Sequence, residues 1–355
     1  MIVVFYISGH GLGHASRATE LIDRLTSQGE NNLRVVVRTS APAWAFLRVQ
    51  KPSVEVQRCD TDPGVAQVDS LTIDEDETMR RAAAFYREFE RRAKDEATHL
   101  QQLGATLVVS DIPPIAFAAA HLAGIPSVAV ANFTWEWIYA YYARFERTAP
   151  GVIDTMARAY EHATLALRLP FPGGFQSMAA VTRDIPFIAR RSARAPADTR
   201  RVLGLDSRQL IVLSSFTGHG LALPYQRLAA SGLAVLAPEQ VPTAGLRYED
   251  LVAAADVVVS KPGYGIVSDC VANGTPLLYT SRGRFAEYDV MVGEMPRLLR
   301  CRFIAGKDVV SGNWMDGIQA LCAQPEVPER PRVDGAAIAA DAILTLGRAS
   351  IPFCR

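Results

Sequence analysis

Two histidines lie in a short glycine-rich segment near the N-terminus. Residues 9–14 read Gly-His-Gly-Leu-Gly-His and follow an apolar run. Glycines let a ligand approach the backbone closely, and the N-terminus of a following helix favours the neutral imidazole that can act as a general base. The loop departs from the dinucleotide-binding fingerprint at two positions: His14 replaces its third glycine, and the next apolar run ends in Arg38 instead of an acidic residue. Dinucleotide binding is therefore disfavoured. We therefore expect proton transfer by His14 or His10, the alternative being a histidine that only hydrogen-bonds the turn.

A carboxylate ends another apolar run of the first half. Asp111 closes residues 107–111, Leu-Val-Val-Ser-Asp. If this run is a strand of the same parallel sheet, its C-terminal end shares an edge with the histidine loop. Asp111 could then hold an imidazole in one tautomer and stabilise its protonated form. An N-cap for a helix that starts near Pro114 is an equally good interpretation.

Polar glycine segments follow apolar runs in the second half as well. Residues 260–269, Ser-Lys-Pro-Gly-Tyr-Gly-Ile-Val-Ser-Asp, place backbone N–H groups at a predicted helix N-terminus, which suits a diphosphate. Asp269 falls one to two turns into that helix, where a carboxylate could bond a ribose diol. Residues 214–218 could contribute from a neighbouring loop. Both segments could instead be simple tight βα turns.

A third polar segment, residues 279–289, follows the apolar run 276–279. Glu287 and Asp289 could accept hydrogen bonds from sugar hydroxyls, and Arg282 or Arg284 could offset phosphate charge. An aromatic cluster at residues 135–142 could line an acceptor cleft, or it could belong to the core or to an interface.

The elements that must position these residues alternate between strand and helix. In the first half, apolar runs at 3–7, 33–37, 107–109 and 127–131 predict buried parallel strands, with helices at 16–25 and from about 114. Residues 72–103 predict one long amphipathic helix. The second half repeats the alternation with strands at 210–213, 233–237, 257–259 and 276–279. A final helix is expected at about 334–346.

Length and composition predict two soluble α/β domains. A chain of 355 residues exceeds one ordinary core, so we expect an N-terminal domain at 1–182, a Pro- and Arg-rich linker at 183–201, a C-terminal domain at 202–332, and a terminal helix at 333–355 that could pack back on the first domain. Lys+Arg and Asp+Glu are both 37, which argues against a nucleic-acid or anionic-membrane partner.

Cysteine spacing and apolar runs indicate the compartment. The five cysteines form no C-x-x-C pair, so no disulfide framework or zinc site is expected. No signal peptide or membrane span is predicted. We expect a cytoplasmic protein without stable membrane association, as a monomer or a homodimer.

Four motifs in order carry a resemblance to a known family. Residues 9–17, 132–139, 184–190 and 263–269 together resemble the glycosyltransferase-like portion that precedes the kinase domain in plant L-arabinokinases, and its free-standing bacterial relatives. More distantly the chain is similar to GT-B transferases, including the enzyme that adds N-acetylglucosamine to lipid I. The resemblance implies two Rossmann-like domains facing a cleft, with a small acceptor on the first and a nucleoside-diphosphate sugar, UDP-sugar favoured, on the second. The kinase half has no counterpart, so sugar phosphorylation is not expected.

The resemblance also implies roles for individual residues. His14 stands where the family often has its general base, and Asp269 stands where many relatives have a ribose-binding Glu. Thr217-Gly218 replaces the expected phosphate-loop glycine pair. The full expectation is a catalytic set of His14, Asp111 and His10; acceptor contacts from Gly11, Gly13, Trp135 and Trp137; and donor contacts from Ser215, Thr217, Gly218, Gly263, Tyr264, Gly265, Ser268, Asp269, Arg284 and Glu287.

The expected reaction is a metal-independent, inverting sugar transfer with no cofactor beyond the nucleotide-sugar co-substrate. Positioned charges and N–H donors would stabilise the leaving group in place of a metal ion. Two alternatives remain: a UDP-sugar epimerase or hydrolase on the same fold, and a module that binds nucleotide sugars without chemistry.

Overall fold

A computed structural model describes residues 1–28, 32–69, 71–205, 209–216, 221, 223–238 and 245–349. The chain forms two compact units. Unit 1 comprises Met1–Ala66, Asp74–Ile188 and Asp334–Arg355, and unit 2 comprises Gln67–Ile73 and Ala189–Val333. The chain thus passes from unit 1 to unit 2 inside the predicted linker. The short segment Gln67–Ile73 groups with unit 2, although the predicted ranges assign it to the N-terminal domain.

Unit 1 is built on a parallel sheet of seven strands in the order β3-β2-β1-β4-β5-β6-β7. The strands are β1 (Ile2–Ile7), β2 (Arg34–Thr39), β3 (Val54–Arg58), β4 (Leu107–Asp111), β5 (Ser127–Phe133), β6 (Leu165–Gly173) and β7 (Thr182–Asp184). The strand order reverses between β1 and β4, whose register pairs Ile7 with Asp111. In open parallel sheets, ligands bind beyond the carboxyl ends of the strands at this kind of reversal.

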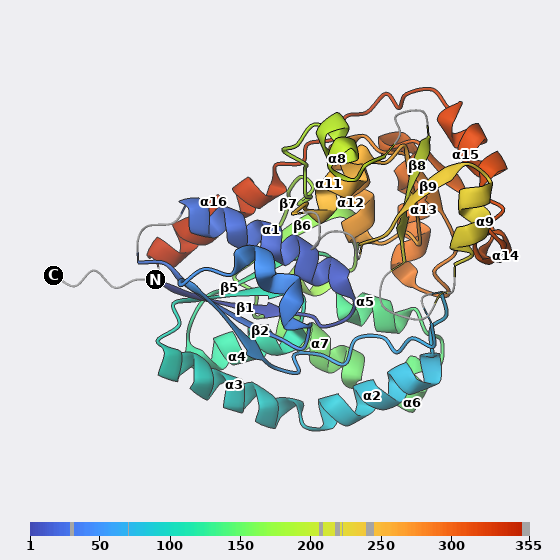
Figure 1. Cartoon of the computed structure of the whole chain (residues 1–355). Coiled ribbons are helices and arrows are strands. Elements are labelled where there is room, and N and C mark those ends of the chain that lie inside the picture. The colour runs from blue at the N-terminus through green and yellow to red at the C-terminus, as the bar shows by residue number, and fades with distance from the viewer. Residues whose placement is uncertain are drawn as a thin grey trace. The chain divides into compact units, whose positions relative to one another are not determined.

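Helices cover both faces of the unit 1 sheet (Figure 1). Helices α1 (Leu12–Gln28) and α16 (Gly335–Ala349) pack together on one face, and α3 (Phe89–Leu103) and α4 (Pro114–Ala123) lie on the other. The remaining helices of the unit are α2 (Glu75–Arg87), α5 (Trp135–Ala140), α6 (Phe145–Thr148), α7 (Val152–Tyr160) and the 3-10 helices η1 (Ala43–Val49) and η2 (Gln176–Val181).

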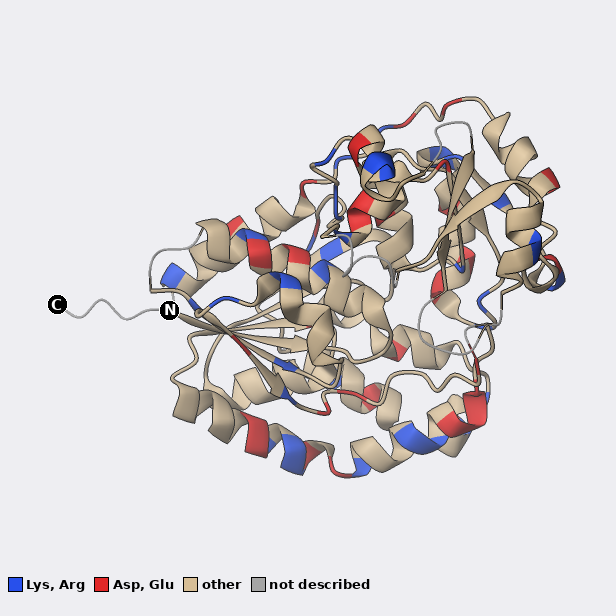
Figure 2. Ribbon diagram, viewed as in Figure 1, with Lys and Arg blue, Asp and Glu red and all other residues tan. Residues whose placement is uncertain are grey.

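The predicted long helix over residues 72–103 is two helices, α2 and α3, because Glu88 between them leaves the helical conformation at φ −106° and ψ 10°. Charged residues of both signs gather on these two helices, whereas the sheet strands carry few (Figure 2). This distribution matches a solvated helix face over an apolar core.

Unit 2 has a parallel sheet of five strands in the order β12-β11-β10-β8-β9. The strands are β8 (Leu210–Ser215), β9 (Leu233–Leu236), β10 (Val257–Ser260), β11 (Leu277–Tyr279) and β12 (Cys301–Phe303); the helices are α8 (Pro196–Val202), α9 (Tyr225–Ala230), α11 (Tyr248–Ala254), α12 (Tyr264–Asn273), α13 (Ala286–Leu298), α14 (Gly306–Ser311) and α15 (Met315–Cys322). Here the order reverses between β8 and β10, and the core packs around the fully buried Trp314. The predicted α/β class with two parallel sheets is confirmed. Among the described helices, none is long and apolar enough to span a bilayer.

Candidate active site

The histidine loop connects β1 to α1 at the reversal point of the unit 1 sheet. Helix α1 begins at Leu12, earlier than predicted, so His14 is its third residue. Gly9 packs so closely on the next loop that a Cβ would lie 2.0 Å from Ser40 Oγ, and Gly11 has φ +70°. These two positions require glycine, which explains why the loop can turn tightly enough to place His14 at the sheet edge.

His14 contacts the carboxylate at the end of β4. Its Nδ1 lies 2.9 Å from Asp111 Oδ1, and both side chains are buried. Arg17, one turn further along α1, donates to both Asp111 oxygens: Nε lies 2.5 Å from Oδ2 and Nη2 lies 2.5 Å from Oδ1. A third guanidinium nitrogen, Nη1, donates to Asn132 Oδ1 at 2.5 Å. Strands β4 and β5 and helix α1 therefore fix one buried cluster.

The charge state of the cluster decides the tautomer of His14. Burial alone would raise the pKa of Asp111, but the Arg17 guanidinium and His14 outweigh it and hold that pKa below its usual value. An ionised carboxylate only accepts hydrogen bonds and a guanidinium only donates, so Asp111 Oδ1 at 2.9 Å and Arg17 Nη2 at 3.1 Å place opposite demands on His14 Nδ1. The shorter, charge-assisted contact with Asp111 favours the tautomer with the proton on Nδ1. His14 Nε2 is then an acceptor, which is the arrangement that a general base needs. Helix α4 is capped at Pro113 without a side-chain bond, so Asp111 is not its N-cap.

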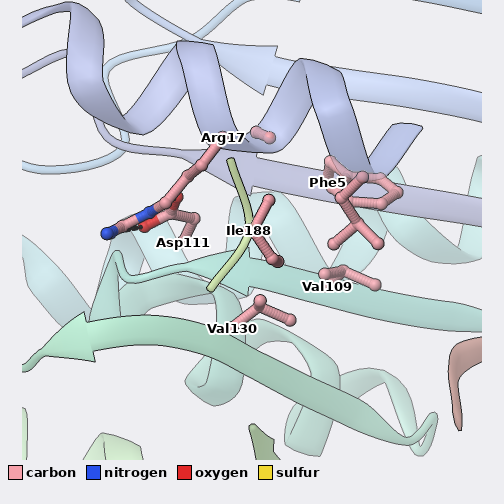
Figure 3. A pocket seen from close by; sticks show the side chains of 8 residues that line it. Phe5, Arg17, Val109, Asp111, Val130 and Ile188 are labelled. Atoms are coloured by element: carbon pink, nitrogen blue, oxygen red, sulfur yellow. Dashed lines mark hydrogen bonds and ion pairs between the residues drawn. The ribbon is translucent and has the colours of Figure 1, made fainter. Parts of the chain in front are cut away.

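Apolar side chains close the inner side of the ion pair (Figure 3). A void of about 10 Å³ lies there, lined by Phe5, Arg17, Ala18, Leu21, Val109, Asp111, Val130 and Ile188. A water molecule needs at least about 10–15 Å³ and two to four polar partners. The void is at the lower limit of that volume, and apart from Arg17 and Asp111 its lining is apolar, so the two side chains are each other's main polar partners on this side.

The contacts of His10 favour the opposite tautomer to that of His14. The backbone N–H of Val65 donates to His10 Nδ1 at 3.3 Å, so a neutral His10 carries its proton on Nε2 and acts as a donor. The two rings lie 6.5 Å apart, and Trp135 packs against both, at 5.5 Å from His10 and 6.1 Å from His14. Trp135 is fully buried beside both imidazoles, and its predicted acceptor contact stays a prediction. Trp137 instead packs on Gly173 and Gly174, where added Cβ atoms would meet its side chain.

A second carboxyl group, Asp62, is buried in the segment after β3, contacts Ser8 of the histidine loop, and was not predicted. Ser8 Oγ donates to Asp62 Oδ1 at 3.0 Å, while the buried Oδ2 has no hydrogen-bond partner. Burial raises the pKa of Asp62 to about 6, and His14 and Ser8 oppose this rise. Asp60 and Asp62 form an Asp-x-Asp spacing, a pattern that holds a metal ion in some transferases. No cluster of three or more potential metal-ligating side chains occurs in the described part of the chain.

In unit 2, the loop after β10 leads into α12 as predicted, with Gly263 as the N-cap and no side-chain cap. Lys261 lies in this loop. Burial and the neighbouring Arg282 lower its pKa to about 8, and Asp69 partly opposes them. Arg282 Nη1 would lie 3.7 Å from a Cβ on Gly263. Two cations thus flank a helix N-terminus, which favours an anionic ligand. Tyr264 and Gly265 form the buried first turn of α12, and Thr217 and Gly218 lie outside the described residues.

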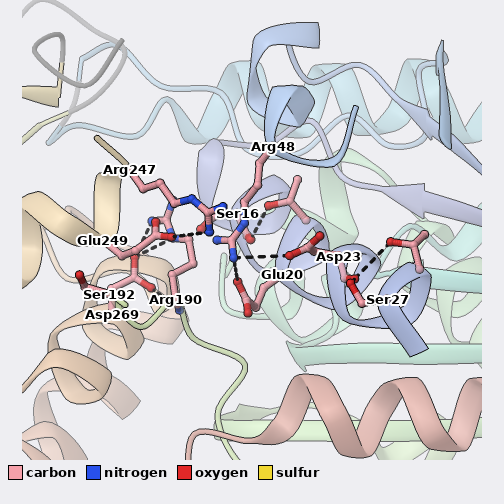
Figure 4. A network of polar contacts seen from close by, with 12 residues as sticks. Ser16, Glu20, Asp23, Ser27, Arg48, Arg190, Ser192, Arg247, Glu249 and Asp269 are labelled. Atoms are coloured by element: carbon pink, nitrogen blue, oxygen red, sulfur yellow. Dashed lines mark hydrogen bonds and ion pairs between the residues drawn. The ribbon is translucent and has the colours of Figure 1, made fainter. Parts of the chain in front are cut away.

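Asp269 has a partner within unit 2 (Figure 4). The Arg190 backbone N–H donates to its Oδ1 at 2.9 Å, and the Arg190 guanidinium donates to its Oδ2 through Nε at 3.0 Å and through Nη2. The predicted ribose contact of Asp269 stays a prediction, since both oxygens are already engaged. Ser268 is also turned inward and donates to Gly265 O at 3.0 Å, while Ser215 Oγ lies 2.5 Å from Tyr248 Oη.

Glu287 is buried at the start of α13 and pairs with Arg282. Arg284, which the prediction favoured, is exposed. The pairing of Glu287 with Arg282 was not predicted, and the donor roles expected for Glu287 and Arg284 stay predictions. Arg282 also stacks over Phe285, with its Cζ 4.1 Å from the ring centroid.

Sequence reasoning missed several residues of these clusters. Arg17, Asn132 and Arg190 were not assigned roles, although all three occur in the motifs that carry the family resemblance. The sequence signals for Asp62 and Lys261 were weaker. Asp62 has a second aspartate nearby, and Lys261 lies just before the glycine turn. The common reason is that their partners are distant in the sequence.

Comparisons with known proteins agree with this architecture. No family model matches the chain. L-arabinokinase from Arabidopsis thaliana is 30% identical over 340 residues, which cover 88% of this chain but 31% of that protein. The chain therefore spans about a third of the length of this relative, and the predicted resemblance to it is confirmed.

Solved glycosyltransferases share the fold. The glycosyltransferase VinC in complex with dTDP has 17% identity and a TM-score of 0.53, covering 98% of this chain and 96% of its own. Phytolacca americana UGT2, complexed with UDP-2-fluoro-glucose and pterostilbene, has 12% identity and a TM-score of 0.57, covering 98% and 94%. The chain has the GT-B glycosyltransferase fold.

Proposed function

Starting from the GT-B fold, we propose that this protein transfers a sugar from a nucleoside-diphosphate sugar, with UDP-sugar favoured, to a hydroxyl group of a small acceptor. The reaction inverts the anomeric centre and uses no metal ion. One observation carries the proposal: the Nδ1 of His14 faces the ionised Asp111 at 2.9 Å, which leaves Nε2 as an acceptor at the ligand-binding edge of the unit 1 sheet.

In the proposed reaction, His14 Nε2 takes the proton of the acceptor hydroxyl as its oxygen attacks the anomeric carbon. The new O–C1 bond forms as the bond from C1 to the phosphate oxygen breaks, and the electron pair leaves with the nucleoside diphosphate. His10, as a donor through Nε2, would hold an acceptor oxygen. Trp135 packs beside both imidazoles and forms an apolar wall.

Unit 2 would bind the donor. The N-terminal N–H groups of α12, Lys261 and Arg282 supply positive potential for the diphosphate, and Glu287 beside Arg282 could read a sugar hydroxyl. These fixed cations would take the role that a metal ion has in other transferases. Structures of the same fold with dTDP or a UDP-sugar analogue support a nucleotide-sugar donor.

The test is a panel of nucleotide sugars incubated with the protein, with and without a panel of small hydroxyl acceptors and with EDTA throughout. We expect a glycosylated product of inverted configuration by NMR, formed by wild type and not by H14A. Epimerised or free sugar without an acceptor would support the epimerase or hydrolase instead. Tight donor binding without turnover against all acceptors would support the binding module.

A further inference from the structure

A short segment from the N-terminal half of the sequence belongs to unit 2. Residues Gln67–Ile73, between β3 and α2, group with unit 2, although the chain on either side of them belongs to unit 1. Gln67 pairs with Ile73 in an antiparallel bridge, and the Val68 N–H donates to Thr72 O at 2.9 Å. We call this segment, whose described residues are 67–69 and 71–73, the strap.

The strap packs on the loop that follows β11. A Cβ on Gly283 would lie 3.0 Å from Leu71 O and 3.6 Å from Ile73 N, and Gly283 has φ +77°. Both the backbone angle and the close approach of the strap therefore require glycine here. The residue before it, Arg282, pairs with Glu287. The strap thus contacts the loop that carries two of the side chains proposed to bind the donor.

The side chain of Leu71 reaches the loop after β12. A Cβ on Gly306, the first residue of α14, would lie 3.9 Å from Leu71 Cδ1 and 3.9 Å from Thr280 Oγ1. Thr280 follows β11 and is fully buried, and its hydroxyl has no hydrogen-bond partner among the described residues. Buried hydroxyl groups in proteins are normally paired, so an unpaired one is a position that a ligand hydroxyl would satisfy.

Strand order places Leu71 and Thr280 on one side of the proposed donor site. The sheet runs β12-β11-β10-β8, and the diphosphate is proposed to bind at the N-terminus of α12, which follows β10. Glu287, in the helix after β11, would read a sugar hydroxyl. The next loop in the same direction is the one after β12, where Leu71 and Thr280 flank Gly306. The sugar would therefore extend toward these two residues, and the nucleoside would extend the other way, toward β8.

We propose that the strap completes the sugar subsite of unit 2, with Leu71 as its apolar wall and the Thr280 hydroxyl as a hydrogen-bond partner of the donor sugar. This inference rests on the proposed function of unit 2 as the donor domain. Leu71 is a specificity residue for the sugar, and it contributes nothing to the binding of the nucleotide. The donor site then requires a segment from the N-terminal half of the sequence as well as the residues of the C-terminal half.

The test compares nucleotides with nucleotide sugars in the full chain, without an acceptor. Calorimetric titrations use UDP, dTDP, UDP-glucose, UDP-N-acetylglucosamine and dTDP-glucose. They give the Kd of the nucleotide divided by the Kd of its best-bound sugar conjugate. This ratio is measured in wild type, L71A, L71M, T280V and V68A. Val68 is the matched control, because it lies in the same strap and is 66% exposed.

We expect L71A to lower the ratio about tenfold, which is the usual effect of losing apolar contact in a substrate pocket. T280V should lower it about fivefold through the lost hydrogen bond. L71M keeps the side-chain volume and should stay within about twofold of wild type. V68A should match wild type, and the Kd of the nucleotide alone should change in none of these variants. The proposal fails if L71A or T280V leaves the ratio at the wild-type value, if either weakens nucleotide binding equally, or if V68A acts like L71A.

A second measurement follows the docking of the strap without any ligand. An alanine at Gly283 would meet Leu71 O, so the Val68 N–H should lose its protection from hydrogen exchange in G283A. G274A is the matched control, since Gly274 has a similar φ of +70° but no atom within 4 Å of a Cβ. It should keep the protection. Wild-type protection in G283A, or an equal loss in G274A, would overturn the role of the strap.

These outcomes separate the inference from the proposed function. If no sugar transfer is found but L71A and T280V lower the ratio as expected, the sugar subsite stands and the transferase proposal fails. If transfer is found and the ratio stays unchanged, the inference alone is overturned. If wild type binds none of the nucleotides or their sugar conjugates, both are overturned.

Discussion

His14 Nδ1 and Asp111 Oδ1 lie 2.9 Å apart although the two residues are 97 positions apart in the sequence. The parallel pairing of β1 with β4 produces this contact, because it brings the loop after one strand beside the last residue of the other.

Replacing His14 with alanine should lower kcat for sugar transfer by about 10²–10⁴-fold, the usual contribution of a general base. The KM for the donor should change little, because the donor is proposed to bind unit 2. Steady-state kinetics with an identified donor and acceptor measure both. H121Q is the matched control, since His121 is exposed on α4 and stacks on His162 at 3.8 Å. Near-wild-type kcat in H14A would remove His14 as the base.

The buried Arg17–Asp111 pair should show strong non-additivity in stability. D111N leaves the Arg17 charge buried without its partner, which should cost about 3–5 kcal/mol of unfolding free energy. The double variant R17M/D111L removes both charges and should be clearly more stable than D111N in urea unfolding. The exposed pair Arg168–Asp184 is the control, and R168A/D184A should change stability by about 1 kcal/mol or less. Equal losses in D111N and the double variant would contradict this account.

D62N should stabilise the protein at neutral pH, with a gain that disappears in acid. The pKa of Asp62 is about 6 in the folded protein against 3.8 ordinarily, so the folded state binds more protons between about pH 4 and 6. The unfolding free energy of the wild type should therefore fall as pH rises through this window. That of D62N should not, because asparagine does not ionise. The advantage of D62N should grow from near zero at pH 4 to at most about 3 kcal/mol at pH 7. Urea unfolding at several pH values measures it; a pH-independent difference, or a similar gain in D184N, would argue against burial as the cause.

Donor binding should weaken as pH rises through about 8. Burial and Arg282 lower the pKa of Lys261 to about 8, so above that pH Lys261 loses its charge and the remaining cation, Arg282, is paired with Glu287. Calorimetric titration with UDP from pH 6.5 to 9.5 should show this decline. K261M should bind about tenfold more weakly at pH 7 and lose the decline, as expected for one charged hydrogen bond of about 1.4 kcal/mol. K307M, at an exposed lysine of unit 2, should behave as wild type. A wild-type profile in K261M would exclude this lysine from the donor site.

The engagement of Asp269 by Arg190 predicts that D269N acts mainly on stability. Arg190 would keep its buried position without a charged partner, so unfolding free energy should fall by about 3–5 kcal/mol. The ratio of UDP to 2′-deoxy-UDP affinity should stay within about twofold of wild type. If instead D269N abolishes that ratio at unchanged stability, Asp269 is the ribose ligand that the family resemblance implies.

Local sequence patterns determined much of the fold. Continuous apolar runs predicted β1, β2, β4, β5, β8, β9, β10 and β11, because strands covered by helices on both faces bury nearly every side chain. Strands β3, β7 and β12 were missed because they are largely exposed and have no such run. Strand β6 was also missed although it is mostly buried, because Arg168, Pro170 and Pro172 interrupt its apolar run. The break at Glu88 between α2 and α3 was also missed, since the amphipathic period continues across it.

The sequence also located the histidine loop, Asp111 and the loop before α12, because each follows a predicted strand at its carboxyl end. Only the tertiary structure decided how these groups are charged and oriented. It placed His14 Nδ1 against Asp111 and His10 Nδ1 against the Val65 N–H, set Arg17 across Asp111, and buried Asp62 against Ser8. It also showed that Asp269 forms an ion pair with Arg190 and that Glu287 forms one with Arg282. The physical reason is that tautomer, ionisation and ion pairing depend on distances of about 3 Å between side chains from different strands, and those distances follow from strand order and register rather than from local sequence.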